Sequence, residues 1–219
     1  LALCRERYAS QHPSLIHPKS ILASVYAAQN KYDLAKSIYH RCLGHSRSLH
    51  GERHIQTITL YAQMADLYGK LGELEESESL HRRCLIGQED TLGTEHASTL
   101  ATVYDLAGVL SAQKRYCEAI PLRRRELAWC RQQNGDTDPG TLTSINDLAI
   151  DLCETGELEE AEALFRELLE ARQQVLEPSD FGIGLALRGL AETLEMAGNL
   201  EEAAAFAQQA LDHRLEHEG

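Results

Sequence analysis

The stretch MADLYGKLGELEESESLHRRCL at residues 64–85 decides the fold of this chain. Apolar residues recur at spacings of three and four on both sides of Gly72, which is the period of an amphipathic helix. Glycine readily takes the left-handed conformation that closes a helix, and the adjacent Glu75 and Glu76 favour the first turn of the next one. The stretch therefore predicts two antiparallel helices joined by a short turn.

The same pattern returns every 42 residues without a gap, which indicates a repeat architecture. The turn position is held by Asn30, Gly72, Lys114, Gly156 and Gly198. A column of small residues follows each turn and consists of Ala35, Ser77, Ala119, Ala161 and Ala203. Only a small side chain lets the two helices cross closely there, so we expect Ala119→Leu to destabilise its helix pair by about 1–3 kcal/mol through overpacking.

Each repeat is predicted to contain a first helix, A, and a second helix, B. The A helices are expected over residues 16–28, 58–70, 100–112, 142–154 and 184–196. The B helices are expected over residues 32–49, 74–91, 116–133, 158–175 and 200–216. This pattern predicts a single all-α domain over residues 1–219, with repeats at 14–55, 56–97, 98–139, 140–181 and 182–219. Residues 1–13 match residues 127–139, so Leu1 is expected to begin partway along a B helix of a longer protein.

The loops that follow the B helices share a pattern of their own. Gly51, Gly93 and Gly135 recur, and each loop then carries a polar residue at one aligned position. That position is held by His54, His96, Asp138 and Asp180. A capping or loop hydrogen bond explains histidines in this column better than a metal site does, because aspartates share it.

Composition and charge exclude several classes of function. The 219 residues are 43% hydrophobic and 25% charged, as in a soluble globular protein. The formal net charge of −13 disfavours nucleic acid and anionic membranes as partners. The six cysteines form no CxxC pair, so we interpret them as buried thiols in a reducing, cytoplasmic compartment.

The pattern of Leu-Ala, an aromatic residue, Gly-x-Tyr/Leu, Ala and Ala-Leu resembles the tetratricopeptide repeat (TPR). The period of 42 and the segments at 64–85 and 91–107 are similar to the long-repeat subgroup found in kinesin light chains and bacterial sensor proteins. The resemblance covers essentially the whole chain. It implies a right-handed α-solenoid of antiparallel helix pairs, with about five TPR repeats and a partial N-terminal helix. It also implies a concave groove lined by the A helices.

Projection of the A helices predicts which side chains line that groove. The expected lining consists of Ser20, Ser24, Gln63, Asp66, Lys70, Tyr104, Asp105, Asn146, Asp147, Glu154, Arg188, Glu192 and Glu195. Six of these thirteen residues are acidic and two are basic, and this acidic excess predicts a partner segment that carries Lys or Arg, with Tyr104 available for a cation–π contact. The alternative is that the carboxylates form a solvated face, with the real contacts on the B helices or loops.

Two known binding modes of the family are poorly matched by this sequence. Kinesin light chains carry adjacent asparagines before the Leu-Ala pair, whereas here only Asn146 remains and Asp147 follows it. The two-carboxylate clamp of other TPR proteins needs Lys, Arg and Asn on neighbouring A helices, where this chain has mainly Asp and Glu. The sequence therefore predicts a groove without defining its ligand.

Candidate chemistry is sparse. The segment from His213 to His217 reads HRLEH and matches a zinc peptidase string, but it lies at the end of the last helix without a third ligand. We predict no metal site, no cofactor and no catalytic residue. The basic cluster consists of Arg123, Arg124 and Arg125, with Arg82 and Arg83 one repeat before the last two. Arg123 is expected to face inward, and the others to point outward and to be either solvated or paired with neighbouring glutamates.

The sequence thus predicts a scaffold or sensor module that binds a protein or peptide and is not an enzyme. One alternative is the regulatory arm of a larger enzyme, such as a protease or a signalling ATPase, whose catalytic domain lies outside this sequence. Self-association through the ends of the solenoid is a further possibility, because the last helix carries Phe206, Leu211 and Leu215 where solenoids usually end in a polar cap.

Overall fold

The structure is a computed structural model, and it describes residues 12–177 and 179–217. Helices account for these residues almost entirely, and no strand occurs among them. After a short 3-10 turn, η1 (Pro13–Leu15), the helices are α2 (Ile16–Ala28), α3 (Tyr32–His50), α4 (Ile55–Lys70), α5 (Leu74–Leu92), α6 (Ala97–Ala112), α7 (Tyr116–Asn134), α8 (Pro139–Thr155), α9 (Leu158–Val175), α10 (Phe181–Met196) and α11 (Leu200–His217). The even-numbered helices α2 to α10 correspond to the predicted A helices, and the odd-numbered helices α3 to α11 correspond to the predicted B helices. The all-α solenoid of helix pairs is thereby confirmed.

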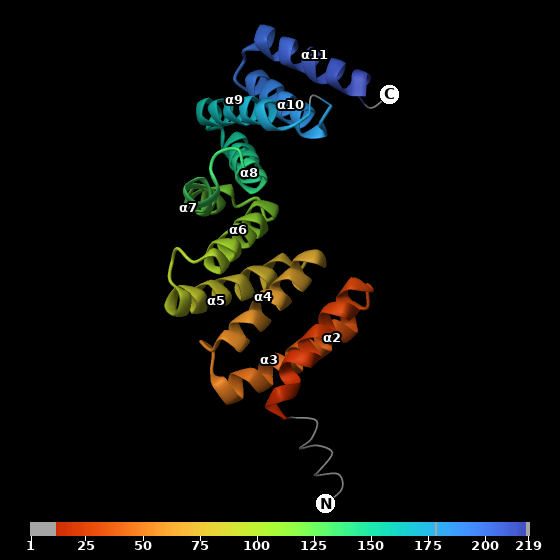
Figure 1. Cartoon of the computed structure of the whole chain (residues 1–219), viewed down its shortest axis with the longest axis vertical. Coiled ribbons are helices and arrows are strands. Elements are labelled where there is room, and N and C mark those ends of the chain that lie inside the picture. The colour runs from red at the N-terminus through yellow and green to blue at the C-terminus, as the bar shows by residue number, and fades with distance from the viewer. Residues whose placement is uncertain (1–11, 178, 218–219) are drawn as a thin grey trace, which may run out of the picture. The chain divides into compact units, whose positions relative to one another are not determined.

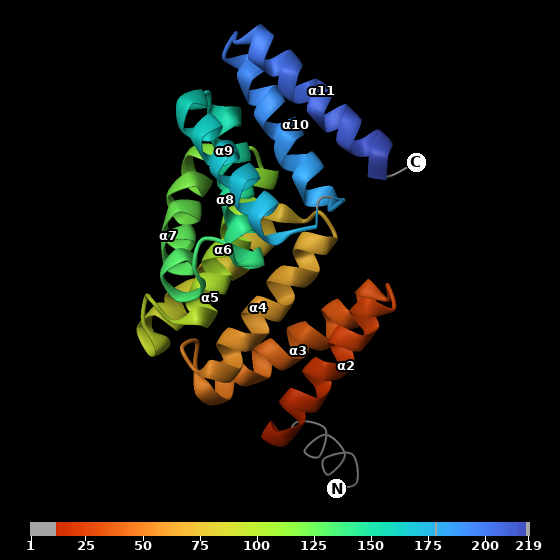
Figure 2. The same ribbon diagram turned by 45° about the horizontal axis from the view of Figure 1, so that its top comes forward.

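The chain divides into two compact units, Leu1–Gln113 and Lys114–Gly219. In the first unit each helix from α2 to α6 packs against the next one along the chain (Figure 1). The same holds from α7 to α11 in the second unit, where Figure 2 shows α10 and α11 side by side. The single domain over residues 1–219 stays a prediction. So does the partial helix at residues 1–13, because only His12 and Pro13 of it lie within the described part of the chain.

The A helices after the first begin three residues earlier than predicted, because the aligned polar residues of the loops are their N-caps. The side chain of His54 accepts a hydrogen bond from the backbone N–H of Gln56, and His96 accepts one from Ser98. Asp138 and Asp180 accept equivalent bonds from the backbone of α8 and α10. The capping role predicted for this column is confirmed. The predicted starts follow the repeated apolar columns, which begin one turn after the cap, so the capped first turn lies outside the predicted helices.

The turns between A and B helices have the left-handed backbone that the glycines predicted. Gly72, Gly156 and Gly198 have φ values of 74°, 82° and 84°. Asn30 and Lys114 hold the same position with φ values of 60° and 61°, although both carry a Cβ. Asparagine tolerates this conformation better than most residues, whereas lysine enters it at a cost in free energy.

The small-residue column lies at the centre of each helix pair. Ala35, Ser77, Ala119 and Ala161 are fully buried, and Ala203 is nearly so. Separate apolar cores surround the column in the two units, from Ile16 to Cys84 in the first and from Ile120 to Ala203 in the second. None of the described helices is long and apolar enough to cross a membrane.

Ala161→Leu should lower the free energy of unfolding by about 1–3 kcal/mol, because the crossing of α8 and α9 leaves no room for three further carbons. Urea denaturation followed by circular dichroism measures the change. Ala163→Leu, at an exposed position on the same helix, is the matched control and should change the stability by less than about 0.5 kcal/mol. Equal effects of the two changes would contradict the close crossing.

Lys114→Gly should raise the free energy of unfolding by up to about 1 kcal/mol, because glycine takes the left-handed conformation without the steric penalty of a Cβ. The opposite kind of change at the equivalent turn, Gly156→Ala, should lower the free energy of unfolding by a similar amount. The added methyl group would meet no atom within 4 Å, so the loss would come from backbone strain alone. Thermal unfolding of the two variants tests the pair. A lower free energy of unfolding for Lys114→Gly would show that contacts of the lysine side chain stabilise the fold by more than the backbone strain destabilises it.

Candidate functional site

A pocket of about 250 Å³ opens between the two A helices α8 and α10 of the second unit. We call it the α8–α10 pocket; it is lined by Asn146, Ile150, Cys153, Glu154, Phe165, Leu185, Arg188, Gly189, Glu192, Thr193 and Met196. Its apolar part contains large side chains that reach solvent, since Ile150 is 46% exposed and Met196 is 56% exposed. Polar and charged groups from both helices surround this apolar surface. The pocket therefore combines an apolar contact area with groups that can orient a ligand.

The close packing of α9 against α10 gives this pocket its shape. Gly189 lies where α10 meets the ring of Phe165, and a Cβ on Gly189 would approach that ring to 2.5 Å. The contact holds Phe165 in the core, where only its edge can line the pocket. Thr193, on the same side of α10, donates its hydroxyl to the carbonyl of Gly189 and lies 3.2 Å from the Cys153 thiol. These neutral contacts leave the charged side chains of the pocket available to solvent.

The charges at the pocket are predominantly negative. Glu154 is exposed on α8, and Glu192 is exposed on α10. Arg188 lies one turn before Glu192, with 3.5 Å between its Nε and the carboxylate Oε1, and both side chains are 65% exposed. An exposed pair of this kind contributes little to stability, so an incoming cation can compete for the carboxylate.

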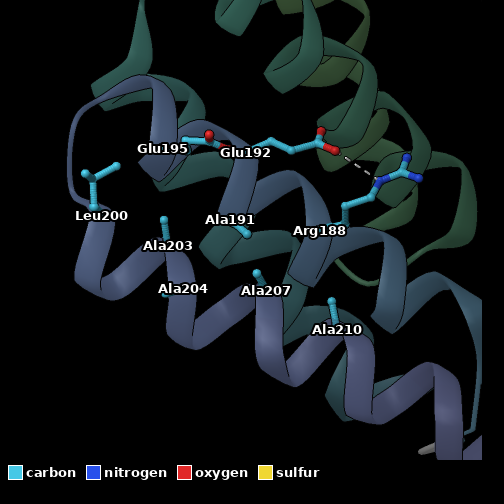
Figure 3. Close-up of a pocket in the computed structure, with 9 residues that line it drawn as sticks. All are labelled: Arg188, Ala191, Glu192, Glu195, Leu200, Ala203, Ala204, Ala207 and Ala210. Carbon is cyan, nitrogen blue, oxygen red and sulfur yellow. Dashed lines mark ion pairs between the residues drawn. The ribbon is translucent and has the colours of Figure 1, made fainter.

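A second, larger hollow of about 440 Å³ lies between α10 and α11. Figure 3 shows Arg188 and Glu192 at its rim and the small side chains of Ala191, Ala203 and Ala207 along its floor. The equivalent surface of the preceding pair, α8 and α9, is covered by α10. This alanine surface is thus the one on which a further helix would stack. Self-association through this end stays a prediction; Leu211 and Leu215 are exposed on α11, while Phe206 packs against the core.

The structure brings together four of the residues predicted for the groove in the second unit. Asn146, Glu154, Arg188 and Glu192 all line the α8–α10 pocket, and Glu195 lines the hollow beside it. Ile150, Leu185 and Met196 were not anticipated from the sequence. The signal for them was available, because Ile150 and Met196 are apolar residues on A helices outside the repeated core columns.

In the first unit the predicted residues have more varied surroundings. Asp66 and Asp105 approach the buried ring of His81, whereas Lys70 is exposed. Gln63 and Tyr104 are half-buried, and Ser24 is exposed with its hydroxyl donated to the carbonyl of Ile21. The expected placement of Ser20 in the groove was wrong, because Ser20 lies on the same buried stripe of α2 as Ile16 and Ala23, at spacings of four and three. Its hydroxyl donates to the carbonyl of His17.

Arg123 faces inward, as the sequence predicted, and its guanidinium forms an ion pair with Asp147. The Nη1 atom of Arg123 lies 3.1 Å from the Oδ2 of Asp147, and its Nε lies 3.5 Å from the Oδ2 of Asp151. Arg123 and Asp151 are buried, while Asp147 is partly exposed. Asp147 is therefore engaged by a buried cation.

Two other arginines, Arg124 and Arg82, are solvent-facing partners of glutamates. Arg124 lies 2.7 Å from Glu160 and 3.3 Å from Glu157. Its hydrogen bond to Glu160 raises the pKa of the guanidinium above its ordinary value. Arg82, one repeat earlier, pairs with Glu78 in the same way. The predicted pairing with neighbouring glutamates is confirmed for these two residues.

The buried cysteines are held in their neutral thiol form. Burial raises the pKa of Cys42, Cys84 and Cys153. Burial also raises the pKa of Cys130 to about 12, helped by the hydrogen bond that its thiol donates to Glu126 Oε1 at 2.9 Å. A thiolate is the reactive form of cysteine, so these four side chains are poor nucleophiles. The zinc peptidase string ends at His217, whose side chain lies outside the described residues.

Arg123→Met should lower the free energy of unfolding by about 3–5 kcal/mol, because it leaves the buried carboxylate of Asp151 without a cation. The double variant Arg123→Met with Asp151→Leu should recover much of that loss, since it removes the isolated charge as well. Chemical denaturation of the two variants measures both effects. A loss below about 1 kcal/mol in the single variant, or no recovery in the double one, would show that the ion pairs do not matter for stability.

Comparison with known proteins is consistent with this architecture. The family model described as tetratricopeptide repeat matches residues 14–90, 98–174 and 144–216. No curated protein sequence matches the chain.

Several solved structures are similar to the chain over most of its length. The kinesin light chain TPR-like repeats from Podospora anserina superpose with a TM-score of 0.82 at 21% identity, covering 94% of this chain and 97% of that one. BtubC (BKLC) from P. vanneervenii has a TM-score of 0.77 at 17% identity, with 94% and 82% covered. YrrB, described as a TPR protein with an unusual peptide-binding site, has a TM-score of 0.66 at 20% identity, with 91% and 87% covered. At these identities the likenesses establish the shared fold.

Proposed function

Because the chain belongs to the tetratricopeptide repeat family, we propose that it binds an extended peptide segment of a partner protein in the α8–α10 pocket. TPR repeats serve generally as protein-interaction scaffolds. The observation that carries the proposal is the convergence of Ile150 and Met196 with Glu154, Arg188 and Glu192 on one concave surface. An apolar side chain of the ligand would enter between α8 and α10, and its neighbours would meet the charged groups.

The size of the pocket favours a peptide over a small molecule. Sites that enclose a small ligand usually measure about 300–1,000 Å³, whereas this pocket measures about 250 Å³ and is open to solvent. That volume fits one or two side chains of a longer ligand. The rest of the peptide would then lie along the A helices, where a repeat protein presents an extended concave surface.

The preferred ligand segment is basic. Glu154 and Glu192 supply two exposed carboxylates at the pocket, and the formal net charge of −13 adds a long-range attraction for cations. A Lys or Arg of the ligand can replace Arg188 at the carboxylate of Glu192, since that pair is held only loosely at 3.5 Å. The ligand would therefore carry a large apolar residue beside Lys or Arg.

The proposed role requires no catalysis by this chain. Support comes from the raised pKa values of its buried thiols, which disfavour a cysteine nucleophile. We also place the protein in the cytoplasm, on the grounds that Cys42, Cys84, Cys117, Cys130 and Cys153 are free thiols, as is typical of a reducing compartment. The regulatory arm of a larger enzyme stays an alternative prediction.

Selection of a displayed random-peptide library on the immobilised chain tests the proposal. Enriched peptides should carry a large apolar residue next to Lys or Arg, and Glu192→Lys should weaken their binding at least about tenfold, or about 1.4 kcal/mol. Ile150→Asp should weaken it similarly by removing the apolar contact.

The matched control is Glu170→Lys, which makes the same change in net charge at an exposed position of α9 outside the pocket. It should leave the affinity within about twofold of the original. Equal weakening by Glu170→Lys and Glu192→Lys would mean that only the overall field matters. Enriched peptides without basic residues would contradict the proposed preference, and binding insensitive to both pocket variants would contradict the site.

A further inference from the structure

A histidine and two aspartates from three successive helices meet in the first unit. Asp66 lies on α4, His81 on α5 and Asp105 on α6, and one nitrogen or oxygen atom of each lies within 4.8 Å of the others. His81 is only 3% exposed, whereas both aspartates reach solvent and the side chain of Asp66 is 56% exposed. The cluster thus has a buried nitrogen on its inner side and two accessible carboxylates on its outer side.

The hydrogen bonds of the His81 ring define which nitrogen faces the aspartates. Ser77 donates its hydroxyl to the backbone carbonyl of Ala65 at 2.9 Å, so its oxygen is left to accept a bond from His81 Nδ1, which lies 3.4 Å away. A neutral ring that donates through Nδ1 carries its lone pair on Nε2. His81 Nε2 is buried without a hydrogen-bond partner and lies 3.7 Å from Asp66 Oδ1, beyond hydrogen-bonding distance.

This arrangement places a nitrogen lone pair beside the carboxylate of Asp66, with a carboxylate oxygen of Asp105 in the same 4.8 Å cluster, and such a group of electron-rich atoms suits a positive charge between them. The next repeat shows how the same position can be satisfied. Arg123 holds the place of His81 in that repeat, and Asp147 holds the place of Asp105. The guanidinium of Arg123 lies 3.1 Å from Asp147 and 3.5 Å from Asp151, so a permanent cation fills the site there. An imidazole, unlike a guanidinium, carries no permanent positive charge.

We propose that Asp66, His81 and Asp105 bind a divalent transition-metal ion of the Zn²⁺ class. Zinc binds nitrogen and carboxylate oxygen at about 2.0–2.2 Å, so two ligand atoms of a tetrahedral ion lie about 3.3–3.6 Å apart. The 3.7 Å between His81 Nε2 and Asp66 Oδ1 is close to that separation. The exposed aspartates can close the remaining gap by small side-chain rotations, and solvent completes the coordination.

The groups around the cluster fit this assignment. A histidine that ligates a metal usually donates its other ring N–H to a fixed acceptor, and Ser77 provides that acceptor. An imidazole ligand favours Zn²⁺ and similar ions over Mg²⁺ and Ca²⁺, which prefer oxygen ligands alone.

Isothermal titration of the full, tag-free chain with ZnCl₂ tests the proposal. We expect one saturable site per chain, with no comparable uptake of MgCl₂ or CaCl₂. His81→Phe should weaken zinc binding by more than about 100-fold, since the loss of an outer hydrogen-bond partner alone costs about 10- to 100-fold. This variant should fold, because Tyr39 and Phe165 are buried at the same position of other repeats.

Two further variants keep the test independent of folding and of other histidines. Asp105→Asn changes an exposed side chain and should also weaken the zinc site at least about tenfold. His50→Gln alters the stacked pair of His50 and His54, whose ring centroids lie 4.4 Å apart, and should leave the titrated site unchanged. The proposal is overturned if zinc binds equally well to the chain with His81→Phe, if His50→Gln removes the site, or if the original chain takes up no zinc.

Discussion

The two helices of each repeat cross at a residue no larger than alanine or serine, and the rest of the structure depends on that crossing. Ala161 and its equivalents are buried where the A and B helices touch, which fixes the angle and register of each pair. Once the pair is fixed, its outer apolar residues can be covered only by the next pair. The A helices α8 and α10 are brought beside one another in this way, and the α8–α10 pocket lies between them.

The crossing residues recur every 42 residues, and this regular spacing explains why so much of the fold could be predicted from one sequence. The 42-residue register places apolar columns, small residues and turn glycines at fixed offsets, and every helix in the described residues follows it. The exceptions are local. The A helices after the first start three residues earlier than expected, because His54, His96, Asp138 and Asp180 cap a turn that lies before the repeated apolar columns. Capping depends on a side chain reaching a particular backbone N–H, which spacing alone does not reveal.

The candidate site was predictable only in part. Projection of a helix shows which way a side chain points, but it does not show which residues of other helices lie next to that side chain. Asn146, Glu154, Arg188 and Glu192 were placed on the groove side and converge on one pocket. Asp147 has the same direction but is engaged by Arg123, whose inward position was foreseen without its partner. His81 shares the column of Arg123, yet its place opposite Asp66 and Asp105 depends on contacts among three helices. The repeated columns reveal such sites only after the structure shows which columns meet.

The acidic residues of the A helices have different partners. In the second unit Asp147 and the buried Asp151 are paired with Arg123, whereas Glu154 and Glu192 at the pocket are exposed to a ligand. In the first unit the carboxylates near His81 are balanced by a bound ion in our proposal. Acidic residues on the A helices thus divide into those satisfied within the chain and those available to a partner.

Hydrogen–deuterium exchange with and without a peptide enriched from the library tests the central claim most directly. The account predicts slower exchange in the facing halves of α8 and α10, with the outer face of α9 unchanged, because the ligand would cover the backbone beside Ile150 and Glu192. Protection confined to the B helices or the loops, with α8 and α10 unaffected, would contradict a peptide site in the α8–α10 pocket.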